Sequence, residues 1–146
     1  MLEAIYNYLL LSDTLATSGQ PTEEQIIDIA QAGFQVVVNL ALADADYALK
    51  DEQASVEAQG MVYIHIPVIW KQPTPTDLQA FFKIMDDHKD QKVFVHCAAN
   101  MRVSAFMALY RIKRLGWSAE EAYKDMYRIW TPDETWQGFI DQALTS

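Results

Sequence analysis

Short apolar runs that alternate with helical patterns constrain this chain more than any other feature. Residues 34–40 contain Val36-Val37-Val38, residues 61–68 are Met-Val-Tyr-Ile-His-Ile-Pro-Val, and residues 92–96 are Lys-Val-Phe-Val-His. Continuous runs of this length that are rich in β-branched residues are typical of strands buried on both faces. We therefore predict an α/β fold with a mostly parallel central sheet flanked by helices.

Helices are expected before, between and after these strands. Thr22 and Gln25 form a capping-box pattern that begins a helix, and Gly33 ends it. Further helices are expected over residues 43–59, from Thr76 onward, over residues 101–115, from Ser118 to Trp130, and over residues 132–144. We expect residues 1–146 to form a single domain, because a chain of this length can bury a full core.

The charge balance and hydropathy exclude two classes of partner. Asp and Glu number 20 against 11 Lys and Arg, so the formal net charge is -9 and no nucleic-acid partner is expected. No apolar run approaches the ~20 residues that span a bilayer, so no membrane partner is expected. Glu3 stands where a secretory signal would carry basic residues. We expect a cytoplasmic protein, or an exported one whose signal is absent from this chain.

The segment from His96 to Arg102 joins the last predicted strand to a helix and has the composition of an anion-binding loop. Ligands of parallel sheets bind at the carboxyl ends of strands, where helix N-termini also point. Small residues let the backbone N–H groups of such a loop turn inward around an anion. The residues predicted to bind substrate in this loop are Ala98, Ala99, Asn100 and Met101.

Three side chains of this segment are candidates for catalysis. Cys97 is the only cysteine, which excludes an internal disulfide, and its place before the helix favours a thiolate nucleophile. The planar fork of Arg102 is suited to two oxygens of a tetrahedral anion. Ser104 is expected to donate a hydrogen bond to the sulfur of Cys97 and make it a better leaving group in a second step.

Several short motifs resemble those of a known family. Val95-His96-Cys97, followed by a loop and Arg102, resembles the cysteine-dependent phosphatases of the dual-specificity and tyrosine phosphatase superfamily. A bacterial branch of that superfamily, unknown-function family 442, is sometimes attached to β-lactamase-like hydrolases, and the resemblance to it covers residues 15–115. The further motifs that carry it are Ser18-Gly19-Gln20-Pro21-Thr22, Val37-Val38-Asn39-Leu40 and Ile66-Pro67-Val68.

The resemblance implies a dual-specificity-phosphatase-like fold, a phosphocysteine intermediate at Cys97 and phosphoryl binding by Arg102. The expected ligand is a phosphorylated substrate or another small oxyanion. In the superfamily five residues separate the cysteine from the arginine, whereas four do so here, and Asn100 stands where a glycine is usual. The shorter loop resembles that of rhodaneses. Sulfur transfer through a Cys97 persulfide and a non-catalytic module that binds anions or phospho-ligands are therefore alternatives to the phosphatase.

The aspartate that serves as general acid in the family has no counterpart directly after Ile66-Pro67, where this chain has Val68-Ile69-Trp70-Lys71. Asp77 and Asp133 are weak candidates, since each is also expected at the start of a helix, where a carboxylate is favourable. Trp70 is expected to wall the ligand pocket. The histidines lack the spacing of metal ligands, so no metal or other cofactor is predicted.

Overall fold

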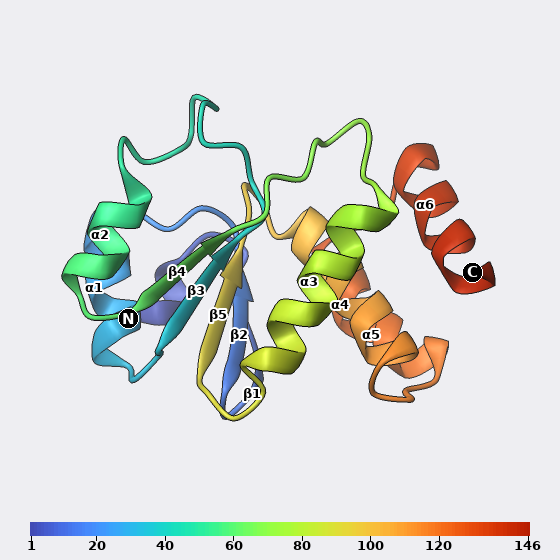
Figure 1. Ribbon diagram of the computed structural model, residues 1–146, viewed down its shortest axis with the longest axis horizontal. Coiled ribbons are helices and arrows are strands. Elements are labelled where there is room, and N and C mark those ends of the chain that lie inside the picture. The colour runs from blue at the N-terminus through green and yellow to red at the C-terminus, as the bar shows by residue number, and fades with distance from the viewer.

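The computed structural model describes residues 1–146 as one five-stranded sheet with helices on both faces (Figure 1). The elements in chain order are the 3-10 helix η1 (Leu2–Ala4), β1 (Leu9–Ser12), β2 (Leu15–Ser18), α1 (Glu23–Gln31), β3 (Val36–Asn39), α2 (Glu52–Ala58), β4 (Val62–His65), α3 (Pro75–Asp87), β5 (Val93–His96), α4 (Met101–Lys113), α5 (Ala119–Ile129) and α6 (Glu134–Thr145). No helix combines the length and the hydropathy needed to cross a bilayer.

The strand order is β1-β2-β5-β3-β4, and only β1 runs antiparallel to its neighbour. The prediction of a mostly parallel sheet flanked by helices is confirmed. Ser18 and Asn39 each pair with His96, and His65 pairs with Asn39. These residues therefore lie side by side at the carboxyl ends of their strands. The segments that follow β3, β4 and β5 therefore leave the sheet at one edge.

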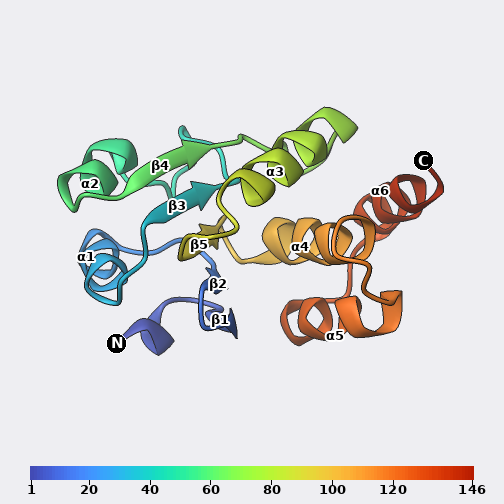
Figure 2. The ribbon, with the colours of Figure 1, turned by 60° about the horizontal axis from the view of Figure 1, so that its bottom comes forward.

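Alternate residues of the central strands enter two separate hydrophobic cores. Helices α1 and α2 lie on one face of the sheet, and α3 to α6 lie on the other (Figures 1 and 2). Val37 and Phe94 pack with Ile26 and Ile29 of α1 on the first face. The larger core on the second face contains the alternate strand residues, such as Val38 and Val95, and the apolar faces of α3 to α6. This alternation explains why the strand sequences are apolar throughout.

The structure corrects three sequence predictions. The hairpin of β1 and β2 was missed, because each strand has only four residues and half of β2 is polar. The helix expected over residues 43–59 begins only at Glu52, where Asp51 caps it by accepting from the N–H of Ala54. The next helix begins at Pro75, which favours a first helical position, and the cap is Thr74 and not Thr76.

We predict a large loss of stability when Phe106 is replaced by alanine. Its side chain is fully buried, and its ring centroid lies 5.7 Å from that of Phe81 and 5.8 Å from that of Phe139. Phe106→Ala should lower the free energy of unfolding in urea by about 3–5 kcal/mol, because it leaves a cavity between three helices. Leu144→Ala near the exposed C-terminal end is the control, with an expected loss of about 1 kcal/mol or less.

Candidate active site

Cys97 lies at the base of a turn between β5 and α4. The residue has no solvent-exposed surface, and its N–H donates to the carbonyl of Ser18 at 3.3 Å. Asn100, immediately before α4, has a φ of 66°. Asparagine tolerates this left-handed conformation better than most residues, which explains how it replaces a glycine here. The sequence therefore forms the tight turn that was expected, with Cys97 at its start.

The backbone of this turn leaves several donors free. The N–H groups of Ala98, Ala99, Met101 and Arg102 donate to no acceptor within the protein. Two of them belong to the first turn of α4, a helix of 13 residues whose N-terminus carries a partial positive charge. Free N–H groups on successive residues are the arrangement that binds oxyanions in proteins.

A hollow of about 190 Å³ lies over this turn. Its lining contains most of the residues predicted to bind substrate, together with the two principal catalytic candidates. They are Trp70, Cys97, Ala98, Ala99, Met101 and Arg102. Asn100 is buried beneath the turn and does not line the hollow. None of the lining residues carries a carboxylate, so the only formal charge in the lining is that of Arg102.

The guanidinium of Arg102 is buried and has only neutral partners. Nη1 donates to the carbonyl of Val68 at 2.9 Å, and Nη2 donates to the hydroxyl of Tyr47 at 3.1 Å. The guanidinium also lies 5.9 Å from the ring centroid of Trp70. No salt bridge involves Arg102, and the whole residue is only 5% exposed. A buried charge without a counterion is costly, and binding an anion would remove that cost.

His96 is buried and does not reach the hollow. Its Nε2 atom lies 2.5 Å from the carboxylate of Glu52, which also accepts from Gln20 at 2.9 Å. Burial alone raises the pKa of Glu52, but hydrogen bonds from His96 and Gln20 outweigh it and hold the pKa below its usual value. The other ring nitrogen of His96 lies 3.4 Å from the carbonyl of Cys97. This buried hydrogen-bonded pair therefore supports the strand end from which the turn begins.

The N-terminal segment holds the turn from the opposite side. The side chain of Asn7 donates to the carbonyl of Ala99, and the side chain of Asn100 donates to the carbonyl of Asn7, both at 2.9 Å. Gly19 passes so close that a Cβ atom there would lie 2.6 Å from the carbonyl oxygen of Ala98 and 2.7 Å from the ring of Tyr6. Only glycine allows this approach.

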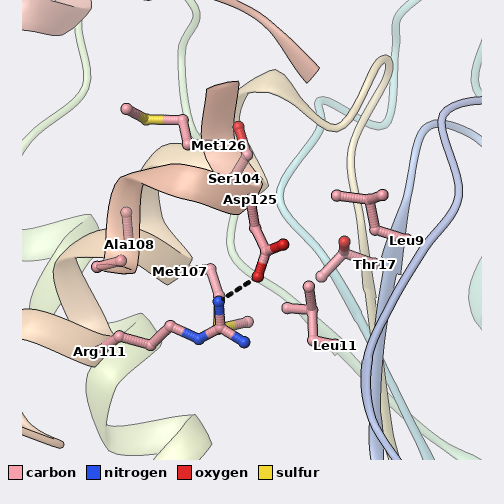
Figure 3. A pocket seen from close by; sticks show the side chains of 10 residues that line it. Leu9, Leu11, Thr17, Ser104, Met107, Ala108, Arg111, Asp125 and Met126 are labelled. Atoms are coloured by element: carbon pink, nitrogen blue, oxygen red, sulfur yellow. Dashed lines mark hydrogen bonds and ion pairs between the residues drawn. The ribbon is translucent and has the colours of Figure 1, made fainter. Parts of the chain in front are cut away.

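Ser104 does not make the hydrogen bond to Cys97 that the sequence suggested. Its hydroxyl donates to the carbonyl of Met101 at 2.9 Å and accepts from the indole of Trp130 at 3.0 Å. Figure 3 shows Ser104 instead among the side chains around a very small hollow beside the Arg111–Asp125 ion pair. A hydroxyl in the first turn of a helix can reach its own backbone, and that local acceptor competes with the sulfur.

Neither aspartate considered as a general acid lines the hollow. Asp133 is the N-cap of α6 and accepts from the N–H of Trp136 at 2.9 Å. Asp77 lies in the first turn of α3. Both carboxylates therefore stand where the helix dipole favours a negative charge, as the sequence also allowed.

Sequence reasoning missed four residues that the structure brings to this site: Asn7, Gly19, Glu52 and Tyr47. Gly19 belongs to a motif that the sequence singled out, but nothing indicated its contact with Ala98. Glu52 and Tyr47 come from residues 43–59, which were expected to form one helix. Their partners are 44 and 55 positions away in the chain, so no pattern of neighbouring residues in the sequence could predict these contacts.

A family model described as a DSP-PTPase phosphatase fused to NAD+ kinase matches residues 11–137. The chain is also 30% identical over 106 residues to a β-lactamase hydrolase-like protein of Xylella fastidiosa. That match includes 70% of this chain but only 24% of the relative. The chain thus spans about a quarter of the length of this curated relative.

Solved structures share the whole fold. A crystal structure of a DUF442 protein from Shewanella putrefaciens CN-32 is 35% identical, covers 99% of this chain and 95% of its own, and has a TM-score of 0.90. TpbA of P. aeruginosa is 19% identical, with coverage of 94% and 84% and a TM-score of 0.75. A TpbA variant has been crystallised with phosphotyrosine; it is 16% identical, with coverage of 96% and 91% and a TM-score of 0.68.

The buried Glu52–His96 pair predicts a specific pH dependence of stability. Because the folded-state pKa of Glu52 is lowered, its stabilisation is complete above the usual value of 4.5 and is lost as the pH falls through the folded value. Glu52→Gln should lower the free energy of unfolding by about 1–3 kcal/mol at pH 7. The difference from the unmodified protein should shrink in acid, as measured by urea unfolding from pH 7 to pH 3.

Glu57→Gln, on the exposed face of the same helix, is the control and should change stability little at any pH. A Glu52→Gln difference that stays constant down to pH 3 would contradict this account.

We also predict that the turn does not tolerate a methyl group at residue 19. Gly19→Ala should cost about 1–3 kcal/mol of stability, since two of the three crowded atoms are backbone oxygens that cannot rotate away. Gly138→Ala is the matched control, because nothing lies within 4 Å of its added carbon and alanine favours the helix. Equal effects of the two substitutions on the urea midpoint would show that the contact is unimportant.

Proposed function

This chain belongs to the DSP-PTPase phosphatase family, and we propose that it hydrolyses a phosphoester through a phosphocysteine intermediate at Cys97. Arg102 and the free N–H groups of the turn bind the phosphoryl oxygens. The observation that carries the proposal is the buried Arg102 guanidinium, which has no acidic partner and belongs to a residue that lines the same hollow as the turn. These groups supply positive potential to a molecule whose formal net charge is -9.

The proposed reaction has two displacement steps at phosphorus. The Cys97 thiolate attacks the phosphorus atom, and the bond from phosphorus to the ester oxygen breaks as the sulfur–phosphorus bond forms. Water then attacks the phosphocysteine, which releases inorganic phosphate and regenerates the thiolate. Arg102 and the turn hold the three remaining oxygens in both steps, where charge accumulates in the transition state. Ser104 supports the first turn of α4 through Met101 and does not touch the sulfur.

The expected substrate is a phosphomonoester, because the free donors come from one short turn and one arginine that line a single small hollow. The phosphotyrosine bound to the TpbA variant supports a phosphorylated ligand of this kind for the present chain as well. Trp70, which lines the hollow beside Arg102, offers an aromatic wall to the group that carries the phosphate. The family match favours phosphoryl transfer over the rhodanese-type reaction.

The decisive prediction concerns Cys97. Cys97→Ser should lower kcat for p-nitrophenyl phosphate by about 10³-fold or more, because a serine hydroxyl in this turn lacks a neighbouring base to activate it. The same variant should still bind inorganic phosphate, measured by isothermal titration calorimetry, since Arg102 and the N–H groups remain.

Three results would each reject the proposal. Turnover that survives in Cys97→Ser would exclude this nucleophile. Phosphate binding without turnover in the unmodified protein would indicate a non-catalytic module. A single sulfur atom added to Cys97 by thiosulfate, detected by mass spectrometry in a protein that hydrolyses no phosphoester, would indicate sulfur transfer.

A further inference from the structure

A phosphoester with a poor leaving group needs a proton donor, and the hollow above Cys97 has no carboxylic acid in its lining. Asp133 is committed to capping α6, Asp77 lies in the first turn of α3, and neither carboxylate forms a hydrogen bond or ion pair with Arg102. The donor must therefore come from another side chain near the site of phosphoryl binding.

Tyr47 is the ionisable side chain in contact with Arg102. It stands in the segment between β3 and α2, which rises over the carboxyl edge of the sheet (Figure 1). Its hydroxyl accepts a hydrogen bond from Nη2 of Arg102 at 3.1 Å. The hydroxyl oxygen is the acceptor in that bond, so its own proton is free, and no acceptor within the protein takes it. Tyr47 does not itself line the hollow, but it contacts Arg102, which does, and it is 41% exposed and so accessible to a ligand bound there.

We infer that Tyr47 is the general acid of the first step. This inference rests on the proposed phosphatase activity. As the bond from phosphorus to the ester oxygen breaks, the Tyr47 hydroxyl transfers its proton to that oxygen, and the product leaves as a neutral alcohol or phenol. The resulting phenolate keeps its hydrogen bond from the Arg102 guanidinium, which stabilises the negative charge. In the second step the phenolate takes a proton from the attacking water, which restores the hydroxyl.

Arg102 has enough donors for both tasks. A guanidinium carries five N–H groups, of which one contacts Val68 and one contacts Tyr47. The remaining three are available to phosphoryl oxygens. Binding of the phosphoryl group therefore does not require the Tyr47 contact to break, and it brings the ester close to the phenol. A phenol in this position also explains how the chain dispenses with an aspartate after Ile66-Pro67.

The test compares two substrates that differ in their need for a proton. Phenyl phosphate has a poor leaving group, whereas p-nitrophenyl phosphate has a good one. Tyr47→Phe should lower kcat for phenyl phosphate by about 10²-fold but kcat for p-nitrophenyl phosphate by less than about tenfold. Loss of the Arg102 contact alone would lower both values by the same factor, so the ratio of the two separates proton donation from positioning.

Tyr63→Phe is the matched control. The Tyr63 hydroxyl accepts from Asn39 at 3.1 Å and does not contact Arg102, so its removal should leave the ratio of the two kcat values unchanged. The inhibition constant of inorganic phosphate, measured for each variant, reports whether Arg102 still binds the anion.

Two outcomes would overturn the inference while leaving the phosphatase intact. One is an equal loss on both substrates in Tyr47→Phe. The other is a loss restricted to phenyl phosphate in Asp44→Asn, Asp46→Asn, Asp77→Asn or Asp133→Asn, which would assign the proton to a carboxyl group. If the unmodified protein shows no turnover that depends on Cys97, the proposed function and this inference are both wrong.

Discussion

The approach of Gly19 to Ala98 is the constraint on which the site depends. The end of the hairpin and the turn after Cys97 lie so close that no side chain fits between them, and reciprocal hydrogen bonds from Asn7 and Asn100 close the other side. The carbonyls of Ala98 and Ala99 are occupied by these neighbours, whereas the N–H groups of four residues that line the hollow have no acceptor in the protein. The proposed anion site therefore depends on packing around the turn as much as on the turn itself.

The charge around the hollow is opposite in sign to the net charge of the whole molecule. Its overall charge is strongly negative, yet the lining of the hollow contains a buried arginine and no carboxylate. The nearest structural carboxylate beneath the turn, Glu52, is ionised and satisfied by His96 and Gln20. Glu52 is paired, and no carboxylate lines the hollow. The positive potential of Arg102 and the N-terminus of α4 is therefore not cancelled where a phosphoryl group would bind.

The segments that form the site have different structural roles. Strand β5 and helix α4 are regular elements that place Cys97 and Arg102, whereas the segments after β3 and β4 are irregular and contribute Tyr47, Val68 and Trp70. Parallel strands deliver all of these segments to one edge of the sheet. The turn and Arg102 thus stand on regular elements, whereas irregular segments supply the contacts to Arg102 and a wall of the hollow.

The sequence by itself determined the layered α/β fold, the central strands, the ends of most helices and the turn from Cys97 to Arg102, because these depend on neighbouring residues: hydrophobic periods, caps and small residues. It misplaced the start of α2 and overlooked β1 and β2, because strands of only four residues are too short for a clear hydrophobic period. Only the tertiary structure placed Glu52 against His96, Asn7 against Asn100 and Tyr47 against Arg102. Those partners lie 44 to 93 positions apart. The strand order that brings them together cannot be predicted from any short segment of the sequence.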